Sequence, residues 1–334
     1  MRKGKISESV LKRSVLKHIK THRDEVINGA GVGTDCAVLS FGAEYDTVLS
    51  TAPVCAPIGE ISIYALPAAL NNVAAAGAEP VGVMLSVMLP EETPEDALQQ
   101  MMGQAEEICR ADHVEIVGGH TETVPGLAEA VVTVTGVGRR KHVQDWETLD
   151  RICADQDIVV SKWIGLEGTV RLAKRYRKEL SARYPVRMIE EAAAYDRYLS
   201  VIPEAATAVK SGVCGMHDVS RGGIFGALWE LAERAGVGLE INLKKIPVKQ
   251  ETIEICEFFE INPYELLSGG CLLMTAADGE RLVTALASEN IPAVIIGRTT
   301  GGNDRVIYNE EEKRYLDKPK TDQIYHVKNS YYHE

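Results

Sequence analysis

The sequence predicts an α+β protein of two domains. Its 334 residues are about two domains long by the usual size of a folding unit. Strand-like and helix-like segments are mixed in both halves, without the strict alternation of a βαβ protein. The polar, charged stretch 139–156 separates the halves, so we expect an N-terminal domain of residues 1–150 and a C-terminal domain of residues 151–334.

The composition excludes several classes of protein. A hydrophobic content of 45% and a charged content of 25% are typical of a globular protein. The net charge of −12 argues against nucleic acid or an anionic membrane as the partner. No apolar run approaches the roughly 18 residues of a membrane span, and residues 1–20 lack the apolar core of a signal peptide. The seven scattered cysteines form no C-x-x-C pair, which favours reduced thiols and a cytoplasmic location.

The N-terminal half shows three helical patterns and several short apolar runs. Helices are expected at 6–23, 61–76 and 93–109, and strands at 37–40, 46–51, 81–88, 114–117 and 130–137. The third helix is the best marked, with Thr93 as its N-cap, Pro94 at the first helical position and Asp96 completing a capping box. We expect the apolar stripe of this helix, methionines included, to be core.

The C-terminal half is organised in the same way. Strands are expected at 158–162, 238–243, 270–276 and 293–298, and helices at 167–180, 188–199, 203–211, 224–235, 251–259 and 279–289. The tail 301–334 is polar, with two short strands.

The segment from His217 to Gly223 (HDVSRGG) is the most informative in the chain. It opens a helical pattern that stops at Gly236. Gly222 and Gly223 let a ligand approach bare backbone N–H groups, and the positive end of the helix dipole suits a phosphate. Asp218 would repel a phosphate unless a cation lies between them, which favours an anion site with a metal. The alternative is an ordinary capped helix, with His217 bonded to backbone.

Familiar phosphate-binding and catalytic signatures are missing. The chain contains no G-x-x-x-x-G-K-[ST], H-E-x-x-H or G-x-S-x-G. The glycine-rich GAGVGTDC at 29–36 lacks the third glycine of a dinucleotide fingerprint. A phosphate site here must therefore have another architecture.

Five motifs in order resemble the PurM-like superfamily of aminoimidazole-ribonucleotide (AIR) synthetase. Its members include HypE, selenophosphate synthetase, thiamine-monophosphate kinase and formylglycinamidine synthetase. The motifs are GTDCA at 33–37, STA at 50–52, NNVAAAGAEP at 71–80, GGHTE at 118–122 and HDVSRGG at 217–223. KWIGLEGT at 162–169 and LSGG at 267–270 also resemble second-domain segments of HypE-like and AIR-synthase-related proteins.

The resemblance implies a fold and a cofactor. The strands of the N-terminal domain are expected to form a barrel with those of a second subunit, and a C-terminal α+β domain packs against it. ATP is expected between the domains, with Mg²⁺ bridging its phosphates to aspartates, because carboxylates tolerate a triphosphate only through hard cations.

The resemblance also implies roles for individual residues. Asp35 and Asp218 match metal aspartates, although Asp35 alone would also suit a turn. The other expected site residues fall into two groups. Expected cofactor-binding residues are Gly222, Gly223, Gly118, Gly119, Asn72 and Lys162, where Lys162 either reaches a phosphate or lies on the surface; expected catalytic residues are His120, Glu122 and His217.

The chain departs from the family pattern at several positions. Ala52 and Asn72 stand where the family usually has metal aspartates, which should weaken magnesium binding. His120 replaces the aspartate of the kinases, although G-G-H-T-E looks normal for the AIR-synthase-related branch. The C-terminus lacks the cysteine that carries the carbamoyl group in HypE, and the last cysteine is Cys271. Thiocarboxamide chemistry in the HypE manner is therefore not expected.

These observations lead to a hypothesis with two alternatives. The leading one is an ATP-binding homodimer of the HypE-like, AIR-synthase-related branch that activates a carbonyl or amide oxygen by phosphoryl transfer, on a small-molecule or protein-tail substrate. The first alternative is a nucleotide-binding or scaffolding pseudoenzyme, degenerate at Ala52 and Asn72. The second is an enzyme of purine synthesis.

Overall fold

The computed structural model describes residues 43–142 and 151–327, together with Glu8 and the segments 26–28, 32–33 and 37–40. Apart from Glu8, the predicted helix 6–23 lies outside the described residues. So do Asp35 and the residues after 327.

A six-stranded sheet organises the N-terminal half. Its strand order is β1-β2-β3-β6-β4-β5, and all neighbours are antiparallel except β4 and β5. The strands are β1 (Val26–Asn28), β2 (Ala37–Ser40), β3 (Tyr45–Ala56), β4 (Glu79–Pro90), β5 (Glu115–Val124) and β6 (Ala130–Lys141). Along β3 and β6 buried residues alternate with more exposed ones, so the sheet has one covered and one open face.

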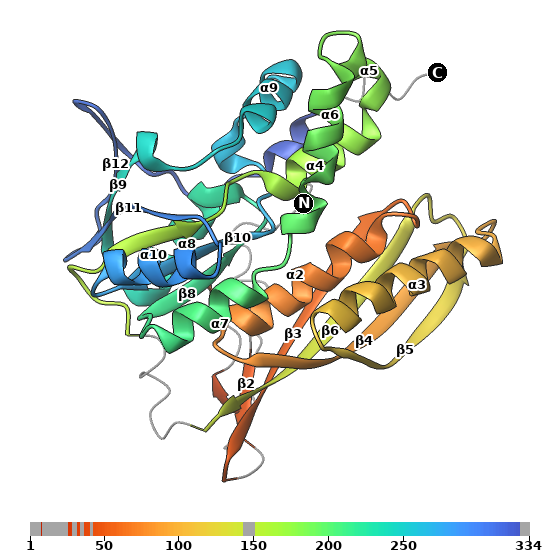
Figure 1. Cartoon of the computed structure of the whole chain (residues 1–334), viewed down its shortest axis with the longest axis horizontal. Coiled ribbons are helices and arrows are strands. Elements are labelled where there is room, and N and C mark those ends of the chain that lie inside the picture. The colour runs from red at the N-terminus through yellow and green to blue at the C-terminus, as the bar shows by residue number, and fades with distance from the viewer. Residues whose placement is uncertain are drawn as a thin grey trace.

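Helices α2 (Ile61–Ala75) and α3 (Glu95–Ala111) cover one face of this sheet (Figure 1). α2 is buried on nearly all sides because it also packs against the C-terminal half. It approaches β6 closely at two glycines. A Cβ on Gly138 would lie 2.3 Å from Val73 Cγ1, and one on Gly136 would lie 3.2 Å from Val73 Cγ2.

A seven-stranded sheet organises the C-terminal half, in the order β13-β12-β9-β11-β7-β10-β8. Helices α7 (Ile202–Lys210) and α10 (Gly279–Ser288) pack on one face and α8 (Gly223–Ala235) packs on the other, because alternate residues of β7 and β10 enter two separate apolar clusters. The strands are β7 (Asp157–Ser161), β8 (Gly215–Val219), β9 (Gly238–Asn242), β10 (Cys271–Ala276), β11 (Ala293–Thr300), β12 (Arg305–Asn309) and β13 (Glu312–Tyr315).

A group of helices stands beside this sheet and has an apolar cluster of its own (Figure 1). It comprises α4 (Leu166–Arg175), α5 (Arg177–Ser181), α6 (Val186–Ala193), the 3₁₀ turn η3 (Ala194–Tyr198) and α9 (Gln250–Phe259). The 3₁₀ turns η4 (Leu243–Lys245), η5 (Pro263–Glu265) and η6 (Gln323–His326) lie in the connections. None of the helices described here is both long and apolar enough to cross a bilayer.

The two-domain α+β class is confirmed, with three local corrections. α3 begins at Glu95 after Pro94, and neither Thr93 nor the capping box closes its N-terminus. β5 continues to Val124, so His120 and Glu122 lie within a strand and do not follow one. The segment 215–219 is a buried strand, β8, that the sequence did not predict.

The barrel remains a prediction. In the described part of the single chain the six-stranded sheet is open, with β5 at one edge. Closure would need strands from a second copy.

Candidate functional site

Helix α8 contacts two of the motifs, the glycine-rich motif near residue 33 and the His217–Gly223 motif. Arg234 joins them, because its Nη1 donates to Gly33 O at 3.3 Å and its Nη2 donates to Met216 O at 3.2 Å. Gly33 has φ +69°, and a Cβ there would lie 2.7 Å from Glu230 O. Only glycine permits so close an approach to the helix. Gly33 is therefore held close to α8 and β8.

His217 and Asp218 belong to β8 and are 2% and 3% exposed. His217 is thus not the helix-start histidine of the alternative interpretation. Its Nε2 lies 3.1 Å from Glu230 Oε2 on α8, which fixes the ring. Asp218 pairs with Leu272 of β10, and because β8 is the last strand of the sheet, β10 fixes its backbone from one side.

The Gly222–Gly223 turn has the expected backbone shape. Gly222 is the N-cap of α8 with φ +87°, and Gly223 has φ +63°. Both amides already have acceptors: Gly222 N–H donates to Asp322 Oδ2 at 2.7 Å, and Gly223 N–H donates to Ser220 O at 3.2 Å. A phosphate bound to Gly222 N–H would therefore have to displace a carboxylate.

The two further motif segments pack against this turn. Ser268 N–H donates to Ser220 O at 3.1 Å, and Ser268 Oγ accepts from Gly165 N–H at 2.7 Å. Gly168 N–H donates to Leu267 O at 2.9 Å. The structure thus brings the segments 162–169, 217–223 and 267–270 together.

Lys162 has a buried environment at the end of β7. Its ammonium donates to Tyr198 O at 2.8 Å and to Ser200 O at 2.7 Å, and it lies 2.5 Å from Glu204 Oε1. An ammonium has three hydrogens, and these three acceptors account for them. A phosphate contact by Lys162 would require an exchange of partners and remains a prediction.

Two positions at which the family usually has a metal aspartate carry other residues in this chain. Asn72 is half-buried on α2, and its Nδ2 donates to Ser50 Oγ at 3.0 Å. Ala52 is buried in the apolar cluster beneath α2. α2 packs on β8, so Asn72 and Asp218 lie on elements in contact.

Strand pairing explains the presence of one of the two glycines of the GGHTE motif in β5. Gly119 has φ +153°, and a Cβ there would lie only 2.0 Å from Leu85 O of β4. Its lack of a side chain thus permits strand pairing. Gly118 faces open space. Cofactor binding by this pair remains a prediction.

His120 and Glu122 lie far from the Gly222 turn. Their side chains are 68% and 50% exposed, and Nε2 of His120 is 3.6 Å from Oε2 of Glu122. In register, His120 faces Ser86, which faces Thr133, which faces Pro53 of β3. Three strand spacings amount to about 14 Å. Since Arg221 donates to Pro53 O at 3.4 Å, His120 is separated by roughly that distance from the point where Arg221 contacts β3.

A cavity of about 480 Å³ lies next to the turn, between the two halves. Both halves of the chain contribute to its walls. It is lined by the end of β3 and the start of α2 (Cys55, Ala56, Pro57, Glu60, Tyr64), by Glu129, by α4 and Tyr176 (Arg171, Leu172, Arg175), by Arg221 and Leu267, and by Ile324, Tyr325 and Val327 near the C-terminus.

The polar groups of this cavity are largely paired. Arg171 stacks 4.1 Å over the Tyr64 ring and bonds to Glu167, while Arg175 pairs with Glu129 at 3.4 Å. Burial and the neighbouring Glu129 carboxylate raise the pKa of the Cys55 thiol. Cys55 is therefore a thiol near neutral pH and a poor nucleophile.

The residues fit a magnesium ion that arrives with a nucleotide. Magnesium in such sites takes one or two carboxylates, and the phosphates supply other ligands. Asp218 offers one carboxylate, and the resemblance assigns a second to Asp35, which lies outside the described residues. Among the described residues, no group of three or more histidine, cysteine, aspartate or glutamate side chains could hold a metal by itself.

Sequence reasoning missed several residues at the site. Asp322 lies in a tail that was expected to be merely polar, and Arg234 and Glu230 lie on a helix face. Their roles depend on contacts across long stretches of sequence. The one local signal is that Asp322 also caps η6 by accepting from Ile324 N–H at 2.9 Å.

The fold matches solved two-domain structures of the PurM-like class. A HypE–HypF complex contains a chain that superimposes with a TM-score of 0.76 at 20% identity, covering 93% of this chain and 100% of that one. A hydrogenase maturation protein HypE in complex with ATP superimposes with a TM-score of 0.71 at 21% identity, covering 96% and 97%. At these identities the likeness concerns the fold.

Sequence comparison gives the family. The N-terminal domain of AIR synthase related proteins matches residues 33–140, and the C-terminal domain matches residues 154–309. A putative hydrogenase expression/formation protein of Methanocaldococcus jannaschii is 25% identical over 336 residues, covering 96% of each chain. The chain belongs to the PurM-like, AIR synthase-related family, in its branch of HypE-like hydrogenase maturation proteins.

Proposed function

We propose that this protein binds ATP with Mg²⁺ between its two halves and activates a carbonyl or amide oxygen of a substrate by phosphoryl transfer. The observation that supports this most directly is the Arg234 bridge, which joins Gly33 of the first motif to Met216 of β8, the strand that carries Asp218. The HypE relative solved with ATP supports a nucleotide as the ligand.

The residues of this chain would act mainly by positioning. Asp218 and Asp35 would hold magnesium, which neutralises phosphate charge, and Asn72 would be a weaker oxygen ligand. Glu230 keeps the His217 ring fixed at the edge of the site. The cavity lined by Arg171, Arg175 and Arg221 lies next to the Gly222 turn and would receive the substrate.

The chemistry is a single displacement at phosphorus. The substrate oxygen forms a bond to the terminal phosphorus as the bond to the ADP oxygen breaks. The phosphate attached through this oxygen is a better leaving group than the oxygen itself, and it departs with that oxygen as a nucleophile forms a bond to the substrate carbon. The names of the relatives extend the proposal to hydrogenase maturation, with a protein partner of the kind that HypF is for a HypE.

His120 and Glu122 require a second copy in this proposal. They lie on the open face of the sheet at its edge, and neither lines the cavity of its own chain. In a homodimer closed through these open faces they would reach the substrate end of the partner's site.

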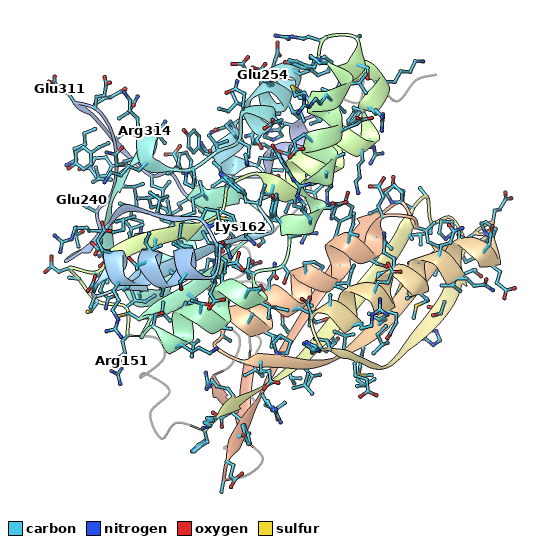
Figure 2. All side chains as sticks on the ribbon, viewed as in Figure 1. Arg151, Lys162, Glu240, Glu254, Glu311 and Arg314 are labelled. Carbon is cyan, nitrogen blue, oxygen red and sulfur yellow. The ribbon has the colours of Figure 1, made fainter. Side chains whose placement is uncertain are left out.

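Single-turnover hydrolysis of ATP with Mg²⁺ tests the activity. We expect ADP release in the presence of a substrate, and Asp218→Asn should weaken Mg-ATP binding by about ten-fold or more. Glu311→Gln is the matched control, since Glu311 is exposed and lies at the periphery of the molecule (Figure 2). Unchanged affinity in Asp218→Asn would contradict the proposed site.

The alternative of a pseudoenzyme is supported by one observation. Ala52 offers no oxygen ligand, and the amide of Asn72 is bonded to Ser50. ADP release by the wild-type protein would exclude this alternative. If the double variant Ala52→Asp/Asn72→Asp releases ADP and the wild type does not, catalysis has been lost in this chain.

A further inference from the structure

The last described stretch of the chain, residues 316–327, runs over the start of α8; we refer to it as the strap. It is anchored at its two ends in different apolar clusters. Leu316 packs with α8 and the seven-stranded sheet, and Val327 packs with the group of helices around α4. Between these anchors Asp317, Lys318 and Lys320 are exposed, whereas Asp322 is only 2% exposed.

The Asp322 carboxylate is held by backbone amides from three segments. It accepts from Gly222 N–H at 2.7 Å, from Leu267 N–H at 3.2 Å and from Ile324 N–H at 2.9 Å. Burial raises the pKa of Asp322, and these three amide bonds oppose that effect. The carboxylate thus connects the strap to both the HDVSRGG and the LSGG segments.

Gly222 N–H lies where an anion is favoured. Gly222 is the N-cap of α8, a helix of 13 residues, and has a left-handed conformation. The positive end of the helix dipole adds to the attraction. The bound carboxylate demonstrates that this position, which we call the anion seat, accepts a negative group. The chain itself fills it.

We propose that the strap is an internal competitor for the anion seat, and that a ligand phosphate displaces Asp322 from Gly222. This inference rests on the proposed function, because it assumes that phosphate enters the same site. The strap can leave the seat by a local movement, since its two ends are anchored separately.

Displacement of Asp322 would also change the cavity. Ile324, Tyr325 and Val327 of the strap form part of the cavity wall. Release of the carboxylate removes one N-cap contact of η6, to which Ile324 and Tyr325 belong. Phosphate binding would thereby be coupled to the shape of the substrate pocket.

Calorimetric titration with inorganic tripolyphosphate and with Mg-ATP tests the competition. Removal of the internal anion in Asp322→Ala should tighten binding about ten-fold, because a larger fraction of the protein then has an open seat. Asp322→Asn keeps the shape without the charge and should show a smaller gain. Asp317→Asn, in the same strap but 74% exposed, should bind as the wild type does.

Hydrogen exchange on the wild-type protein gives a second readout. Saturating tripolyphosphate should leave the Gly222 amide protected and accelerate exchange at the Ile324 amide, which loses its acceptor. This measurement needs no variant, so it decides the question even if Asp322→Ala fails to fold.

The outcomes separate this inference from the proposed function. If the wild type binds Mg-ATP but Ile324 stays protected and Asp322→Ala gains no affinity, the strap is a fixed cap and only the inference fails. If Mg-ATP binds to neither the wild type nor Asp322→Ala, the proposed function fails; tripolyphosphate binding that releases Ile324 would still support the competition.

Discussion

Lys162 and Glu204 form an ion pair inside the protein, with Nζ and Oε1 2.5 Å apart and the two side chains 8% and 2% exposed. The same ammonium donates to the carbonyls of Tyr198 and Ser200. The pair therefore fastens the end of β7 to the start of α7. Figure 2 shows Lys162 within the molecule, whereas Arg151 and Glu311 lie at its periphery.

Removal of Lys162 should be strongly destabilising. Lys162→Met leaves the Glu204 carboxylate buried without its partner, and we expect a loss of about 3–5 kcal/mol in the free energy of unfolding. Lys162→Met/Glu204→Met should recover much of this loss, as measured by urea denaturation. Because the ammonium is fully engaged, the double variant should bind Mg-ATP as the wild type does. A ten-fold weaker affinity would instead support the predicted phosphate contact of Lys162.

Gly222 and Gly223 should differ in their tolerance of alanine. Both have positive φ, which costs an alanine about 1–2 kcal/mol. At Gly222 the added Cβ finds Gly226 Cα at 3.7 Å, an ordinary contact, whereas at Gly223 it would lie 2.5 Å from Tyr264 O. We expect Gly223→Ala to be less stable than Gly222→Ala by a further 1–3 kcal/mol or so in urea denaturation. Equal losses would show that η5 can move away from the turn.

Local sequence patterns predicted the helices and strands in which apolar residues recur at regular spacing. α8 and its end at Gly236 follow from helical spacing and a left-handed C-cap, with φ +66°. β8 was missed because His217 and Asp218 make it look polar, and their burial depends on Glu230 and on β10, far along the chain. The contact of Asp322 with Gly222 spans 100 residues, and no local pattern encodes it.

Asp46 should make stability depend on pH. It is 1% exposed and accepts from Arg140 at 3.2 Å, and its other oxygen lies 2.8 Å from His142 Nδ1. Burial raises the pKa of Asp46, but the bonds with His142 and Arg140 outweigh burial and hold it below its ordinary value of 3.8. A lowered folded-state pKa contributes stability above the unfolded value that is lost as the pH falls through the folded one.

The variant Asp46→Asn measures this contribution. It leaves the Arg140 guanidinium buried without a carboxylate, and we expect a loss of about 3–5 kcal/mol near neutral pH. The difference from the wild type should shrink as the pH is lowered below 3.8. Urea midpoints across the acid range provide the measurement, with exposed Asp317→Asn as control. A difference that stays constant down to the acid limit would rule out the ionised pair as its source.

The open face of the six-stranded sheet should be the interface of a homodimer. Met84 and Met88 of β4 and Val117 of β5 are 49%, 37% and 55% exposed on or beside this face, opposite α2 and α3. Exposed apolar groups gathered on one sheet are typical of an interaction surface. A charge there would have to be desolvated on association, so Met84→Asp should convert a dimer into a monomer in light-scattering chromatography. Val186→Asp, at a 50% exposed position on α6, should leave the dimer intact. A dimer that survives Met84→Asp would place the interface elsewhere. His120 and Glu122 could then not reach the site of a partner subunit.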